Sequence, residues 1–332
     1  MAKTDRHPGR NFEHLWKTFH NRYPFFELRE VDWEAQYQKY RPLITDTTSD
    51  EDLFKVLCEM LDPLDDGHVE LRAKLAGEKK RRKFTPEPIP KFYTEFSKDQ
   101  VRQLFAVTEQ TLAANGFGKL RNTDAWMLKF CRSKTLGYIR FLEFEDIDKR
   151  VLARALKYVL EKFNDLAGVI IDIRDNPGGD DDILLETINR ISAEGRVAFH
   201  RKTRKGHRQG YSKLKSWRIE PKGRSAISAP IILLTCDTVF SGAEVFALAL
   251  RELQNVTIMG DRTNGIFSYQ LEKTMPNGWE YRLSYQIYYS ADMVCYEGVG
   301  VPVDFLHPNT VADLASGRDS LVELALKKLA AR

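Results

Sequence analysis

The stretch that decides the fold is Ile231-Ile232-Leu233-Leu234-Thr235-Cys236-Asp237-Thr238-Val239-Phe240-Ser241-Gly242-Ala243-Glu244. Its continuous apolar start predicts a buried strand, because a strand covered on both faces shows no polar alternation. A helix is predicted over 242–253, so Ser241 lies beside unpaired backbone N–H groups and the positive end of the helix dipole. Such groups can stabilise an oxyanion formed next to the serine. The same residues fit an ordinary capping box from Ser241 to Glu244, and on this motif alone the cap is favoured.

Strands and helices alternate on both sides of this turn, from about residue 135 onward. Continuous apolar strands separated by helices predict an α/β core with a largely buried, parallel-containing sheet. Residues 267–305 predict β-hairpins, with a turn at Pro276-Asn277-Gly278, and 320–331 predicts a closing helix. The predicted strands are 136–142, 169–173, 231–235 and 256–259, and the predicted helices are 147–163, 181–191 and 242–253.

The first half of the chain is predicted to be helical and then charged. Apolar residues recur at three- and four-residue steps over 11–62, and Ser49 fits the N-cap of a second helix. Residues 76–97 are charged and rich in proline, which predicts a loop, and 98–115 predicts another helix. We therefore expect a helical segment at 1–75, a charged loop and helix at 76–134, and the α/β core at 135–332.

The composition excludes several classes of protein. The 332 residues are 42% hydrophobic and 30% charged, which excludes a wholly disordered chain. The net charge is +4 with both signs mixed along the chain, so nucleic acid is not an expected partner. A basic block at 79–83 is interpreted as a solvated loop without a function. The four cysteines are widely spaced and form no CxxC pair, so no metal or other cofactor is predicted.

The sequence predicts a soluble protein. No apolar run approaches the roughly 18 residues of a membrane span. Residues 1–10 are polar and lack the apolar core of a secretory signal. This predicts a cytoplasmic location for the sequence as it stands, or a periplasmic or secreted one if a leader has been removed.

Three more motifs could carry a function, and each also has an ordinary structural interpretation. The loop Asp172-Ile173-Arg174-Asp175-Asn176-Pro177-Gly178-Gly179 follows a buried strand, and its glycines allow positive φ and close approach of a ligand. No G-K-[ST] follows, which excludes a phosphate loop. His68 ends the turn Asp65-Asp66-Gly67-His68, where a lone histidine is usually structural. Glu297 lies in the glycine-rich turn 296–302, where a carboxylate is usually solvated.

Together and in this order, the motifs resemble the tail-specific or C-terminal processing serine peptidases of family S41, in their tricorn-protease-like branch. The matching patterns are D-G-H at 66–68, D-x-R-x-N-x-G-G at 172–179, S-x-A-E at 241–244, G-x-x-T-x-G at 260–265 and E-G-x-G-x-P at 297–302. The resemblance spans roughly 12–75 and 135–310. It implies a crotonase-like (ββα) peptidase core with an N-terminal helical segment, acting as a serine endopeptidase on extended or unfolded polypeptides.

The resemblance also implies roles for individual residues. Many relatives carry a catalytic lysine directly after the T-x-G glycine, but Ile266 stands there, so a histidine base is expected. Residues 76–130 show no pattern typical of a PDZ domain. The implied roles are Ser241 as nucleophile, His68 as general base, Glu297 orienting the base or another polar partner, and backbone N–H groups of Gly242 and of Gly178 or Gly179 as oxyanion hole.

Two other functions stay open. One is a non-catalytic protein that binds a hydrophobic ligand or a peptide on the same fold. The other is a serine esterase, although the G-x-S-x-G elbow is absent because Val239 and Phe240 precede Ser241. The expected partner is a peptide or unfolded protein substrate.

Overall fold

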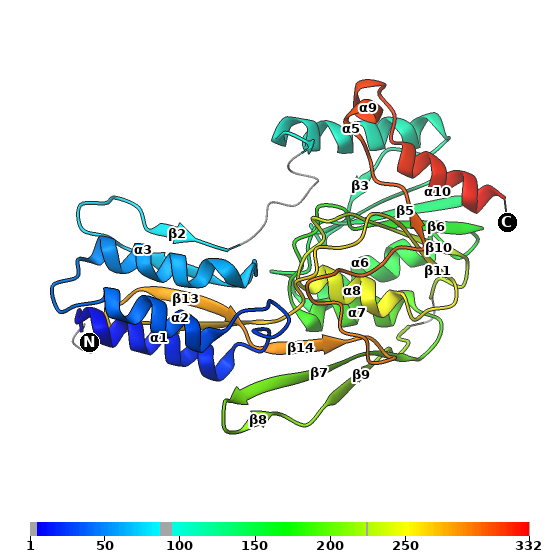
Figure 1. The fold of residues 1–332 in the computed structure, drawn as a ribbon. Coiled ribbons are helices and arrows are strands. Elements are labelled where there is room, and N and C mark those ends of the chain that lie inside the picture. The colour runs from blue at the N-terminus through cyan, green and yellow to red at the C-terminus, as the bar shows by residue number, and fades with distance from the viewer. Residues whose placement is uncertain (1–4, 87–94, 224, 332) are drawn as a thin grey trace. The chain divides into compact units, whose positions relative to one another are not determined.

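The computed structural model describes residues 5–86, 95–223 and 225–331, which form two compact units (Figure 1). The first unit comprises Met1–Pro88, Arg201–Lys215 and Ser268–Tyr288, and the second comprises Ile89–His200, Ser216–Phe267 and Tyr289–Arg332. Two segments from the second half of the chain therefore belong to the first unit, unlike the sequential division into three segments expected above. Part of the predicted loop at 76–97 lies outside the described residues.

The first unit combines helices with a four-stranded antiparallel sheet. The helices α1 (Pro8–Arg22), α2 (Trp33–Tyr40) and α3 (Asp50–Leu61) confirm the helical segment, and Ser49 caps α3 by accepting a hydrogen bond from Asp52 N. The sheet has the order β12-β13-β1-β2. The predicted turn at 276–278 joins its first two strands, and Gly278 has the positive φ of 87° that this turn requires. The strands are β12 (Gln270–Thr274), β13 (Glu280–Ser284), β1 (Glu70–Ala73) and β2 (Arg82–Phe84).

The basic block at 79–83 runs into β2, and three of its side chains form ion pairs. This pairing neutralises part of the positive charge that the sequence alone presents as one cluster. The pairs are Arg81–Glu280, Arg82–Glu51 and Lys83–Glu70.

The second unit is built on a seven-stranded sheet of order β15-β11-β10-β6-β5-β4-β3. The first five strands run parallel to their neighbours, while β4 and β3 are antiparallel. The predicted core strands are confirmed, and β3 and β4 extend the sheet into the part of the chain expected to be a linker. The strands are β3 (Arg121–Asn122), β4 (Leu128–Arg132), β5 (Leu136–Phe141), β6 (Gly168–Asp172), β10 (Ile231–Thr235), β11 (Val256–Gly260) and β15 (Phe305–Leu306).

Helices cover both faces of this sheet (Figure 1). On one face, Ile170 and Ile232 pack with Leu112 of α5 and Leu326 of α10. On the other face, the ring of Phe141 contacts Phe246 of α8 at 5.7 Å between centroids. The helices are α5 (Lys98–Ala114), α6 (Lys149–Glu161), α7 (Asp181–Ile191), α8 (Gly242–Leu250), the short α9 (Val311–Ala315) and α10 (Ser320–Ala330).

A third sheet was not predicted in full. It has the order β14-β7-β8, with β9 also paired to β7. Its strands are β7 (Val197–Gly206), β8 (Gly210–Tyr211), β9 (Lys215–Arg218) and β14 (Gln286–Tyr289). Within the described ranges, every helix is too short or too polar to cross a membrane.

Candidate active site

The backbone at Ser241 adopts a conformation that L-residues rarely take. Its φ is 56° and its ψ is −125°, directly before α8 begins. The Ser241 N–H donates to the Ile266 carbonyl at 3.1 Å, which fixes this turn. The side chain makes no capping hydrogen bond, so the interpretation of the Ser241 hydroxyl as an ordinary helix cap is wrong. Strained backbone of this kind costs of order 1–3 kcal/mol and gathers at functional sites.

The glycine loop after β6 lies against the backbone on both sides of Ser241. Gly178 and Gly179 have φ values of 104° and 134°. A Cβ atom on Gly178 would lie 2.6 Å from the Gly242 nitrogen and 2.9 Å from Ser241 Cβ. Only glycine therefore allows the two turns to approach this closely.

The two loop glycines differ in whether their N–H groups are available. Gly178 N donates to Asn176 Oδ1 at 2.9 Å. For Gly179 and Gly242, no hydrogen-bond acceptor of the N–H lies in the described part of the chain. Of the two glycines considered from the sequence, Gly179 is thus the one whose N–H remains available to a ligand.

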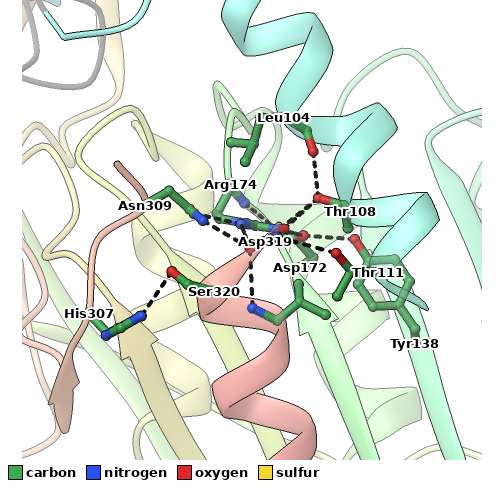
Figure 2. Close-up of polar contacts among 11 residues, drawn as sticks. Leu104, Thr108, Thr111, Tyr138, Asp172, Arg174, His307, Asn309, Asp319 and Ser320 are labelled. Carbon is green, nitrogen blue, oxygen red and sulfur yellow. Dashed lines mark hydrogen bonds and ion pairs between the residues drawn. The ribbon is translucent and has the colours of Figure 1, made fainter. Parts of the chain in front are cut away.

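A buried ion-pair cluster anchors the start of the glycine loop (Figure 2). The side chain of Arg174 is fully buried and pairs with Asp172 at 2.6 Å and with Asp319 at 3.0 Å. Arg174 also donates to Asn309 Oδ1 at 2.7 Å, and Tyr138 donates to Asp172 at 2.7 Å. The Asp and Arg of the D-x-R-x-N pattern are therefore structural. They tie the end of β6 to the chain segment that leads into α10.

The charges in this cluster stabilise one another. Burial alone would raise the pKa of Asp319, but the Arg174 guanidinium and hydrogen bonds from Thr108 and Asn309 lower that pKa below its usual value. Burial likewise disfavours the Arg174 cation, while the two carboxylates hold its pKa well above its ordinary value. Arg174 and Asp319 thus each favour the charged form of the other.

Replacement of Asp319 by alanine is expected to lower the free energy of unfolding by about 3 kcal/mol, because it leaves a buried arginine with one carboxylate fewer. The value is at the low end for such a loss because Asp172 still pairs with Arg174. Urea unfolding would measure it. Glu323→Ala on the same helix is a matched control, since its partner Arg318 is exposed, and should change stability far less. Equal losses in both variants would contradict the assigned role of the cluster.

Glu297 lies in the second unit and is held against the segment that follows the T-x-G glycine. The side chain is 1% exposed, and its Oε2 accepts a hydrogen bond from Phe267 N at 3.0 Å. Gly298 N donates to the Gly265 carbonyl at 2.7 Å. The expectation of a solvated carboxylate is therefore wrong. Ile266, at the position of the lysine in many relatives, is 2% exposed.

Sequence reasoning missed the position of Glu244. This residue was considered only as part of a capping box, yet it is fully buried and accepts hydrogen bonds from Thr263, Gly265 and Ile266. One signal could have found it. Every other residue of α8 is glycine or apolar, and a single acid in such a helix requires a buried partner.

His68 belongs to the first unit and lies just before β1. It is 2% exposed, and its backbone N–H donates to Asp66 Oδ1 at 2.8 Å. Burial lowers the pKa of His68 to about 4; Asp66 opposes this shift and the charge of Arg282 adds to it. The second unit holds Ser241, Glu297 and the glycines of the predicted oxyanion hole.

The described residues include no group of three His, Cys, Asp or Glu side chains placed to hold a metal ion. None of the four cysteines forms a disulfide in the described part of the chain, and burial raises the pKa of Cys131 to about 12 and of Cys236 to about 11. Such thiols are poor nucleophiles at neutral pH.

Comparison with known sequences identifies the family. The model of peptidase family S41 matches residues 135–306, and that of the tricorn protease C1 domain matches residues 6–62. A carboxy-terminal-processing protease of Bartonella bacilliformis is 25% identical over 275 residues, covering 79% of this chain and 61% of that protein. The carboxy-terminal processing protease CtpA of Bacillus subtilis is 24% identical over 161 residues, which are 48% of this chain and 32% of that protein. The chain thus spans less than two thirds of these relatives.

Comparison with solved structures agrees. A crystal structure from Parabacteroides merdae, described as that of a candidate peptidase, has a TM-score of 0.80 and 25% identity, covering 98% of this chain and 97% of that chain. Mature CPAF complexed with lactacystin has a TM-score of 0.72 at 12% identity, with 98% of each chain covered, which shows a shared fold. The family model covers more than half of the sequence, and the protein is accordingly a member of peptidase family S41, with the α/β fold of that family.

Proposed function

We propose that this protein is a serine endopeptidase that hydrolyses extended or unfolded polypeptides, with Ser241 as the nucleophile. The observation that carries the proposal is the strained backbone at Ser241, whose hydroxyl does not cap the helix that follows. A serine that served only as a cap would have no reason to adopt a positive φ. The relatives named above are carboxy-terminal-processing proteases, which favours peptide bonds as the substrate class.

In the proposed reaction, Ser241 Oγ attacks the carbonyl carbon of a peptide bond while His68 takes the hydroxyl proton. The N–H groups of Gly179 and Gly242 bind the oxyanion of the tetrahedral intermediate. Gly178 is the weaker candidate because its N–H already donates to Asn176. His68 then protonates the leaving amine. In the second half of the reaction, His68 takes a proton from the water that attacks the acyl-enzyme and returns this proton to Ser241 Oγ as the acid product leaves.

The choice of His68 as base rests on protonation states. Ile266 has no group that can accept a proton, which removes the lysine mechanism at that position. With a pKa of about 4, His68 is neutral at pH 7 and able to accept the serine proton. We propose that Glu297 orients the base or a polar group of the substrate, since its Oε2 is already fixed by Phe267 N.

A fluorophosphonate probe tests the nucleophile directly, because it reacts with activated serines. We expect a single adduct on Ser241 by mass spectrometry, together with cleavage of an unfolded casein-like protein. An adduct with turnover of simple esters but no peptide cleavage would indicate the esterase alternative. The absence of any adduct, with retained peptide binding, would indicate the non-catalytic alternative.

Gly179→Ala is expected to reduce kcat by about 10²–10³-fold, the usual effect of losing one oxyanion donor. The new Cβ would lie 2.3 Å from the backbone of Phe144, so the loop must move and carry its N–H away. Gly317→Ala is a matched control, because Gly317 also has positive φ but no atom lies within 4 Å of its Cβ position. Steady-state kinetics of both folded variants should separate strain at a glycine from loss of the donor. Equal kcat values would remove Gly179 from the oxyanion hole.

A further inference from the structure

A fully buried carboxylate lies one helical turn from Ser241 and has no part in the reaction described above. Glu244 is the third residue of α8, and it is 0% exposed. Burying an ionisable group in an apolar helix is costly unless hydrogen bonds compensate it. The role of Glu244 therefore lies in the groups that its carboxylate binds.

Three donors from one short segment surround this carboxylate. Glu244 Oε1 accepts from Thr263 Oγ1 and from Gly265 N, both at 2.6 Å, and Oε2 accepts from Ile266 N at 2.7 Å. Burial raises the pKa of Glu244 to about 7, and these hydrogen bonds oppose the rise. Each donor faces a carboxylate oxygen, so the ionised side chain satisfies all of them.

The same segment contacts two residues of the proposed active site. The Ile266 carbonyl accepts from the backbone N–H of Ser241 at 3.1 Å. One residue further on, Phe267 N donates to the carboxylate of Glu297 at 3.0 Å. The segment 263–267 thus fixes the backbone of the nucleophile on one side and Glu297 on the other.

Thr263 extends this connection to the turn that carries Glu297. Its hydroxyl donates to Glu244 and accepts from Val301 N at 2.7 Å. A single side chain therefore joins the start of α8, the segment after β11 and the glycine-rich turn, and all three lie within the second unit.

We propose that Glu244 is a positioning residue, whose carboxylate holds the segment 263–267 in the conformation that sets the backbone of Ser241 and the carboxylate of Glu297. This inference rests on the proposed function. Small displacements of reacting groups are enough to matter, since a misplacement of about 1 Å can lower a rate by about 10²-fold.

Glu244→Gln is the informative substitution because it keeps the size of the side chain. The glutamine has one acceptor oxygen in place of two, so its NH₂ group must face a backbone N–H or the Thr263 hydroxyl, and the segment must shift. We expect kcat to fall by about 10- to 100-fold, with KM changed by less than about 3-fold. The lost interaction positions groups that stabilise the transition state and does not contribute to substrate affinity. The rate of fluorophosphonate labelling at Ser241 should fall with kcat.

The control is Glu186→Gln on α7, which removes a carboxylate that pairs with Arg190 and Lys222. This variant should keep the kcat of the unchanged protein. Thr263→Ser keeps the hydroxyl and should retain most of the activity. Thr263→Val removes the hydroxyl, and its kcat should fall as in Glu244→Gln. The double variant Glu244→Gln/Thr263→Val should be no worse than either single variant, because both break the same connection.

The outcomes separate this inference from the proposed function. If the unchanged protein neither labels at Ser241 nor cleaves peptides, the proposed function fails. If it does both while folded Glu244→Gln keeps kcat within 2-fold, the positioning role is overturned. Should the glutamine variant not fold, equal kcat values for Thr263→Ser and Thr263→Val would overturn the role in the same way.

Discussion

Replacement of Ser241 by alanine will abolish peptide hydrolysis and fluorophosphonate labelling while leaving the fold unchanged. Loss of a nucleophile of this kind lowers kcat by about 10⁶-fold, because the proposed acyl-enzyme forms on the Ser241 hydroxyl. The free energy of unfolding should change little, because the hydroxyl makes no capping hydrogen bond that the substitution could remove. Alanine also has the same Cβ atom as serine, so the strain of the positive φ stays the same.

The measurement combines turnover of an unfolded casein-like substrate with urea unfolding of both proteins. Thr238→Ala is a matched control, because this buried hydroxyl lies in the same turn and contacts Cys236 Sγ at 3.1 Å. It should remain active. Turnover by Ser241→Ala at the rate of the unchanged protein would exclude Ser241 as the nucleophile.

The core of the second unit could be predicted because continuous apolar runs permit few interpretations. The strand expected at 231–235 is observed at Ile231–Thr235, and that expected at 169–173 is observed at Gly168–Asp172. Both are buried at every residue, which is the condition that removes polar alternation from a strand. The helix expected at 181–191 begins and ends at the expected residues.

The third sheet could not be predicted from local pattern. Its long strand β7 reads Val-Ala-Phe-His-Arg-Lys-Thr-Arg-Lys-Gly, and most of these side chains are half-buried. A strand with this little apolar alternation depends on its partners. One of those partners is near Tyr285, about 80 residues later, whose carbonyl accepts from Arg204 N. Nothing local in either segment indicates the other.

The role of Glu244 was hidden for a related reason. Serine followed three residues later by glutamate is the local signature of a capping box, and the sequence offers no way to see what the acid contacts. Three of its donors lie about 20 residues downstream. Periodicity identifies buried faces, whereas the partner of a buried charge is a property of the tertiary fold.

The pH dependence of kcat/KM will show one acidic limb, and we expect it near pH 4. This limb reports the pKa of the base in the free enzyme, which burial lowers to about 4 for His68. Asp65 and Asp66 precede His68 in the sequence, and a carboxylate close to an imidazole favours its charged form, which would move the limb upward. Asp66 does raise the pKa of His68, but burial has the larger effect, so the net shift is downward.

Arg282→Gln should shift the acidic limb in a definite direction, and no such shift is expected if His68 has only a structural role. The positive charge of Arg282 lowers the pKa of His68, so its removal should move the limb to higher pH. Stability should respond as well. Between pH 6.5 and about 4, His68 is protonated in the unfolded chain but neutral in the folded protein. The free energy of unfolding therefore falls as the pH falls through this range.

His68→Ala should therefore remove two features together, the acidic limb and most of the turnover, with a loss of about 10⁶-fold in kcat if the base acts as a unit with Ser241. The pH dependence of stability between pH 4 and 6.5 should weaken in the same variant. Ile266→Lys on this background should not restore turnover, because a lysine has an ordinary pKa of about 10.4 and is protonated at neutral pH unless burial lowers that pKa. Retained activity with an unchanged pH profile in His68→Ala would mean that His68 only supports the turn before β1, and that another residue takes the serine proton.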